Sequence, residues 1–137
     1  MKKYSTKVTL PSWASSLFIV ISMILIPWTI YLSFALPAHH LSKNWDITWV
    51  GLDGIIILSL LSTGILARNR SIYVVISAII TGTLFITDAW FDILSYHWFS
   101  RGFNIALVMA IFGEIPMTIM NYSLAIHVLR KLHNQSK

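Results

Sequence analysis

The sequence of 137 residues contains no cysteine, only 11% charged residues, and no lysine or arginine inside its long apolar stretches. The absence of cysteine excludes disulfides, thiolate metal ligands and cysteine nucleophiles. The low charge and the 56% of hydrophobic residues exclude an ordinary soluble domain and are typical of a polytopic membrane protein. The net charge of +5 forms no basic patch, so we expect no nucleic-acid partner and assign the basic residues to membrane topology.

Four apolar stretches are long enough to cross a bilayer, which takes roughly 20 residues at ~1.5 Å per residue. They cover about residues 14–36, 47–67, 72–94 and 104–128. The connections are short, so the helices must pack as antiparallel neighbours. The sequence therefore predicts an all-α fold, an integral-membrane up-down-up-down four-helix bundle that forms one domain over residues 1–137.

The basic residues are distributed unevenly between the two ends of this bundle. Eight of the ten lie at the end that carries both termini and the 68–71 turn, whereas Lys43 and Arg101 lie at the other end. Basic residues are enriched in cytoplasmic loops. We therefore expect a multi-pass protein of the cytoplasmic membrane with both termini in the cytoplasm and the lipid bilayer as its surroundings.

Four of the five carboxylates lie inside the predicted spans: Asp53, Asp88, Asp92 and Glu114. Charge at membrane depth is costly, so intramembrane acids indicate a functional site by default. Asp53 and Asp88 each lie about seven residues from the outer end of their helices, or ~10 Å deep, and Glu114 lies deeper at ~15 Å. Asp92 stacks one turn above Asp88. The sequence predicts a cation-binding or proton-binding site in the outer half of the bundle.

Histidines lie just above this level, at His39, His40 and His97, and Arg101 follows nine residues after Asp92. Imidazole with carboxylate suits Zn, Mn or Fe, whereas carboxylates alone suit Mg, Ca or protons. The three histidines are candidate mouth residues or metal ligands, and the four intramembrane acids are candidate ligands of a divalent metal ion. The alternative for the histidines is a solvated loop. Arg101 is a candidate rim ion-pair partner of Asp92.

Small residues and aromatic residues have simpler interpretations. Serine and threonine stripes follow the inner faces of the spans, and packing at helix contacts is the favoured role for their hydroxyls. The glycines of the spans are expected to permit close helix approach; these are Gly51, Gly54, Gly64, Gly82 and Gly113. Aromatic residues near the outer boundary, Trp45, Trp49 and Tyr96 among them, are expected to be interfacial anchors. Trp90 and Phe91 either form a wall beside the acids or face lipid.

Two blocks carry a resemblance to a known group of proteins. Trp49-Val50-Gly51-Leu52-Asp53 in the second span and Asp88-Ala89-Trp90-Phe91-Asp92 in the third resemble small, largely uncharacterised four-span bacterial membrane proteins with W-x-G-x-D and D-A-W-F-D blocks. The similarity covers about residues 45–95. It implies a bacterial source and the four-span architecture, and it assigns no activity.

Three functions from different classes remain open. The first is binding of a cation or protons, with transport as its purpose, for which a homodimer would complete a path. The second is an intramembrane metal-dependent enzyme acting on a lipid or lipid-linked substrate, although no H-E-x-x-H motif or nucleophile elbow is present. The third is a structural or accessory membrane subunit whose acids are hydrogen-bonded to the hydroxyl stripes.

Overall fold

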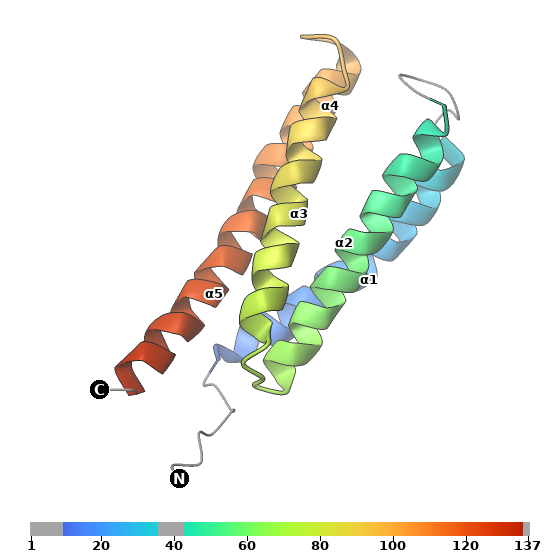
Figure 1. Cartoon of the computed structure of the whole chain (residues 1–137). Coiled ribbons are helices and arrows are strands. Elements are labelled where there is room, and N and C mark those ends of the chain that lie inside the picture. Colours follow the sequence, from blue (N-terminus) through green and yellow to red (C-terminus); the bar gives the residue numbers. More distant parts are fainter. Residues whose placement is uncertain (1–9, 36–42, 136–137) are drawn as a thin grey trace.

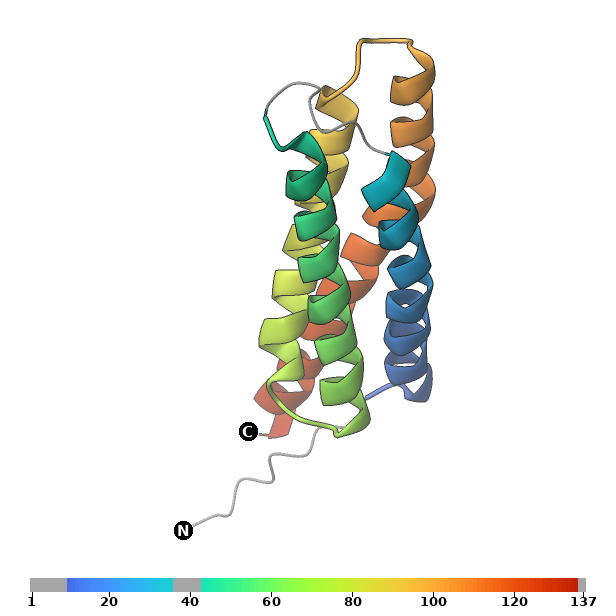
Figure 2. The same ribbon diagram turned by 90° about the vertical axis from the view of Figure 1, so that its right-hand side faces the viewer.

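The computed structural model describes residues 10–35 and 43–135 and shows an all-α bundle (Figures 1 and 2). Its helices are α1 (Ser12–Ala35), α2 (Trp45–Arg68), α3 (Val74–Leu94), α4 (Arg101–Met109) and α5 (Ile115–Gln135). A π-helical segment, Ala110–Glu114, joins α4 to α5 into one continuous span. Within the described ranges, four helical stretches are long and apolar enough to cross a membrane. The predicted four-helix membrane bundle is confirmed.

The outward surface of these helices is apolar, as contact with lipid requires. Large hydrophobic side chains such as Val20, Ile55, Ile76 and Phe112 are exposed along the spans. In water, apolar surface of this extent would mark an interaction site or drive aggregation. In hydrocarbon it is stable, because a helix satisfies its own backbone polar groups. The chain is a multi-pass membrane protein in contact with the lipid bilayer.

The helices form two groups that meet at one end of the bundle. α1 packs along α2, α3 packs along α4 and α5, and the contact between α2 and α3 joins the groups. Figure 1 shows the two groups diverging from the α2–α3 turn toward the end where α4 begins. We call the half with this turn the core half (residues 12–22, 56–85 and 117–135). The other half is the cavity half (residues 23–35, 45–55 and 86–116).

Two glycines allow neighbouring helices to approach closely in the core half. A Cβ atom on Gly64 would lie 2.7 Å from Ile19 Cγ1, and one on Gly82 would lie 2.8 Å from Tyr122 Cε1. The expected close approach is confirmed at these two positions. It is wrong for three other glycines of the spans, at which a Cβ would meet nothing within 4 Å: Gly51, Gly54 and Gly113.

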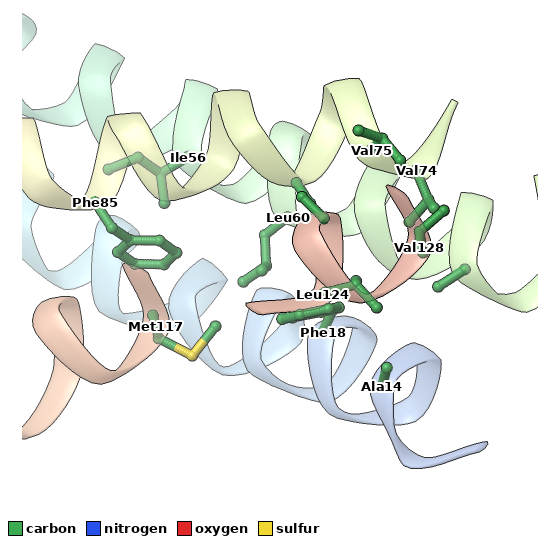
Figure 3. Close-up of a cluster of buried hydrophobic side chains, with 13 residues drawn as sticks. Ala14, Phe18, Ile56, Leu60, Val74, Val75, Phe85, Met117, Leu124 and Val128 are labelled. Carbon is green, nitrogen blue, oxygen red and sulfur yellow. The ribbon is translucent and has the colours of Figure 1, made fainter. Parts of the chain in front are cut away.

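Apolar side chains fill the core half, as Figure 3 shows. Phe18 of α1, Leu60 of α2, Val74 of α3 and Val128 of α5 have no exposed surface, so every span contributes to the cluster. Lipid tails solvate such side chains as well as a protein interior does. The cluster therefore stabilises the bundle through close van der Waals packing rather than through escape from water.

A hydroxyl cluster, made of Ser59 and Thr63 of α2 with Ser77 and Thr81 of α3, links the two groups of helices in the core half. Thr63 Oγ1 lies 2.7 Å from Ser77 Oγ and 3.0 Å from Thr81 Oγ1. Ser59 Oγ lies 2.6 Å from Thr81 Oγ1. Hydrogen bonds of this kind contribute about 0.6 kcal/mol each on average in membranes. The pairing agrees with the favoured role of the hydroxyls in helix packing.

Candidate functional site

The cavity half encloses a cavity of about 310 Å³. Its walls come from the end of α1, the start of α2, the end of α3, and α4 with the π-helical segment. All four intramembrane acids line it: Asp53, Asp88, Asp92 and Glu114. No lysine or arginine of the described residues lines the cavity. The structure thus brings together the four acids that the sequence places inside the predicted spans.

Helical periodicity explains how α2 and α3 present their acids to one cavity. Trp45, Trp49 and Asp53 are four residues apart on α2, and side chains at this spacing share one face. Asp88 and Asp92 have the same spacing on α3. Asp88 is buried, whereas Asp53 and Asp92 are half-buried. Every one of these five side chains lines the cavity.

Thr29 of the neighbouring helix α1 contacts the acid of α2. The buried hydroxyl of Thr29 on α1 donates a hydrogen bond of 3.3 Å to Asp53 Oδ2. The serine and threonine side chains of the spans and the four acids are all described. The bond between Thr29 and Asp53 is the one hydrogen bond found between these hydroxyls and these acids. The hydroxyl cluster, in contrast, is paired internally.

Glu114 is presented by the π-helical segment at Ala110–Glu114. The N–H of Ile115 donates to the carbonyl of Ala110, five residues earlier, and Pro116 has no N–H to continue the regular pattern. Such π-helical turns are often found at functional sites. Glu114 is only 7% exposed, and its Oε2 atom is buried with no hydrogen-bond partner in the described part of the chain. The sequence-based depth estimate assumed a regular helix and did not include this turn.

Aromatic side chains form much of the cavity wall. Trp28 and Tyr31 of α1 line it with ring centroids 5.8 Å apart, and Trp45 and Trp49 of α2 line it with centroids 5.3 Å apart. The Nε1 atom of Trp49 is buried and has no hydrogen-bond partner among the described residues. Sequence reasoning treated Trp45, Trp49 and Tyr96 as interfacial anchors and missed their place in the wall. Their four-residue spacing from the acids was the available signal.

Trp90 and Phe91 were predicted either to form a wall beside the acids or to face lipid, and the structure agrees with the second position. Trp90 is 65% exposed and Phe91 is 53% exposed, and neither lines the cavity. Trp90 lies two residues from each aspartate, so a helical turn of about 100° per residue directs it to the side of α3 away from the acids. Their exposed apolar surface is suited to lipid.

Three apolar side chains form the floor beneath the acids. A smaller cavity of about 110 Å³ extends the site inward, and Asp53, Asp88 and Glu114 line it together with Ile56, Phe85 and Met117. Ile56 and Phe85 are buried and lie one turn or less from Ser59 and Thr81 along their helices. The floor therefore separates the acids from the hydroxyl cluster of the core half.

Tyr96 lies at the outer rim of the cavity, after the end of α3. Its ring packs so tightly against Gly102 that a Cβ atom there would overlap it. Burial, together with the charge of Asp92, raises the pKa of the Tyr96 hydroxyl above its ordinary value. Tyr96 therefore stays neutral at physiological pH and adds no charge to the rim.

Two of the predicted mouth and rim residues, His97 and Arg101, do not line the cavity. His97 is exposed and does not line the cavity, and His39 and His40 lie outside the described residues. Arg101 is exposed, and no ion pair joins it to Asp92, both of which are described. Arg101 instead lines a shallow hollow on the outer side of α4 with Asn104.

The predicted metal site at the four acids is not supported either. Within the described ranges, no three histidine, aspartate or glutamate side chains are arranged so that they could hold one metal ion. A divalent ion needs several ligand oxygens at about 2.0–2.6 Å. The acids are distributed around a cavity rather than gathered at a point.

The bundle and its cavity define a polytopic membrane protein with intramembrane acids around a hollow. No protein-family model, curated protein or solved structure matches the chain. The resemblance to four-span bacterial proteins therefore stays a prediction.

Proposed function

We propose that this protein binds a cation or protons in the acid-lined cavity, as a step in carrying them across the membrane. The observation that carries the proposal is the convergence of Asp53, Asp88, Asp92 and Glu114 on one cavity that no described basic side chain lines. A carboxylate away from water is costly unless a proton or cation neutralises it. A bound cation would neutralise these groups.

The unpartnered oxygen of Glu114 supports the same proposal. Buried polar atoms almost always have a hydrogen-bond partner, and each exception calls for an explanation such as a bound water molecule or ion. Glu114 Oε2 is such an atom, and it lies where the main cavity meets the smaller one. A ligand in the cavity would satisfy it.

The charge distribution favours an outward-facing cavity. Arg68, Arg70, Arg130 and Lys131 lie at or near the core-half ends of α2 and α5, and Lys43 and Arg101 flank the cavity half. By the positive-inside rule we propose that the termini lie in the cytoplasm and that the cavity opens toward the extracytoplasmic side of a bacterial cytoplasmic membrane.

A single copy would hold the ligand without conducting it. Ile56, Phe85 and Met117 line the smaller cavity with apolar surface, on the side of the acids toward the hydroxyl cluster. Passage to the other side would therefore need a rearrangement of the two helix groups or a second copy. We accordingly propose a homodimer as the working form for transport.

The two other predicted functions have less support. A metal-dependent enzyme would need a ligand set, and His97 lies outside the cavity. A purely structural role would pair the acids with the hydroxyl stripes, whereas Thr29 with Asp53 is the pairing found among those described groups. The observations favour binding.

Tryptophan fluorescence tests the proposal, because Trp28, Trp45 and Trp49 line the cavity. Purified protein in nanodiscs is titrated with protons, Na⁺, Mg²⁺ and an organic ammonium ion. We expect at least one to change the emission with saturation, and the change to be lost in Asp53→Asn and Glu114→Gln. Asp46→Asn is the control, because Asp46 does not line this cavity. Emission that responds to none of these, or equally in all variants, would contradict the proposal.

A further inference from the structure

We infer that the ligand of the cavity is an organic cation, an amine or quaternary ammonium ion with an apolar body. This inference rests on the proposed function and narrows its ligand from cations in general to one chemical class. Its basis is the combination of acids, aromatic walls and cavity size in one place.

The size of the cavity suits a small molecule. Pockets for small organic ligands have volumes of about 300–1,000 Å³, and this one measures about 310 Å³. An inorganic ion bound directly by protein needs converging ligands, and the described residues hold no such set of three histidine or acidic groups. A compact organic cation would instead fill the space and meet acids on several walls.

The walls have the chemistry that recognises such a cation. Aromatic faces attract organic cations, and aromatic cages are the usual binding sites for quaternary ammonium groups. Trp28 and Tyr31 on one side and Trp45 and Trp49 on another line the cavity. Leu32 and Ile105 add apolar surface, against which the body of the ligand would pack.

The acids supply the charge that aromatic rings alone lack. Glu114 is more than nine-tenths buried, lines both cavities, and has an oxygen without a partner among the described groups. Asp88 is buried nearby in the same lining. A cationic head between these acids and an apolar body toward the tryptophans would satisfy both sets of residues.

Equilibrium binding of phenyltrimethylammonium, with binding of Na⁺, Mn²⁺ and protons measured in parallel, tests this inference on the full chain in nanodiscs. We expect saturable binding of phenyltrimethylammonium that Glu114→Gln abolishes. Trp49→Ala should weaken it by about tenfold, while Trp49→Phe should retain most of it. The matched control is Trp90→Ala, which removes an exposed tryptophan of α3 outside the cavity and should leave binding unchanged.

The outcomes separate this inference from the proposed function. Acid-dependent binding of Na⁺, Mn²⁺ or protons without phenyltrimethylammonium binding would overturn the inference and leave the proposed function standing. Absence of binding by every cation would overturn both. Two further outcomes would overturn the inference, because the site would then lie elsewhere. One is phenyltrimethylammonium binding that persists in the double variant Glu114→Gln, Asp88→Asn. The other is an equal loss of binding in Trp90→Ala and Trp49→Ala.

Discussion

The core half and the cavity half treat buried polar groups in opposite ways. Thr63 in the core half is fully buried and its hydroxyl contacts both Ser77 and Thr81. Glu114 in the cavity half is almost as deeply buried, yet one of its oxygens has no partner in the described part of the chain. The difference shows that buried polar residues inside a membrane bundle can have more than one role. Paired hydroxyls hold helices together, whereas a buried acid oxygen without a partner beside a cavity, such as Glu114 Oε2, is consistent with the proposed ligand.

The closeness of helix packing also differs between the core half and the cavity half. Gly64 and Gly82 of the core half have neighbouring side chains against them, whereas Gly113 of the cavity half, which lines the smaller cavity, has open space. The closely packed half would act as the fixed part of the bundle. The hollow half leaves room for a ligand and for relative movement of the two helix groups.

The largest effect on stability is expected from Phe18→Ala in the core half. Phe18 is fully buried in the apolar cluster, and removing such a ring typically costs about 3–5 kcal/mol because a void remains. The comparison variant is Leu32→Ala, whose side chain already borders the cavity, so we expect a loss below about 1 kcal/mol. Thermal unfolding in detergent measures both. Equal losses would show that the two halves do not differ in packing.

A smaller effect is expected from adding one methyl group at a glycine. Gly82→Ala places a Cβ against the Tyr122 ring and should destabilise the bundle by about 1–3 kcal/mol through overpacking. Gly51→Ala meets open space and should be neutral or slightly stabilising, since alanine favours a helix. The same unfolding measurement applies. A stable Gly82→Ala variant would contradict the close contact between α3 and α5.

The smallest effect on stability is expected from neutralising an acid of the cavity. Asp88→Asn keeps the shape of the side chain and removes a costly buried charge, so the unfolding temperature should stay the same or rise while cation binding is lost. Thr63→Val is the matched control in the core half and should lose about 1 kcal/mol with its hydrogen bonds. A loss above about 1 kcal/mol for Asp88→Asn would favour the structural-subunit hypothesis instead.

The sequence was sufficient for the bundle, because span length and hydropathy depend on composition over about 20 residues. It also selected the acids that share the cavity, since Asp53 and Asp88 have matching distances from their helix ends. The depth of a residue below the end of its helix can be counted from the sequence. The spans of the described chain, such as Val74–Leu94, lie close to the predicted ranges for this reason.

Rotation about the helix axis was much harder to predict. The pairing of Arg101 with Asp92 was inferred from a short loop, but loop length does not fix which face of α4 carries Arg101. The π-helical turn before Ile115 changes the direction of the Glu114 side chain, and it depends on tertiary packing as well as on Pro116. Gly113 and Pro116 on either side of Glu114 were the local hint.

The central claim is that the cavity half holds an acidic site that a cation can reach, and the cysteine-free chain allows a direct test. Ala106 lines the cavity at 3% exposure, and Ala125 lies in the apolar cluster at 2% exposure. Each is replaced by cysteine and treated in membranes with a trimethylammonium or a sulfonate methanethiosulfonate reagent. We expect the cationic reagent to modify Ala106→Cys, with a preference over the anionic reagent about tenfold above that of a free thiol, and Ala125→Cys to stay unmodified. Equal unreactivity of both cysteines, or no charge preference at Ala106→Cys, would contradict the claim.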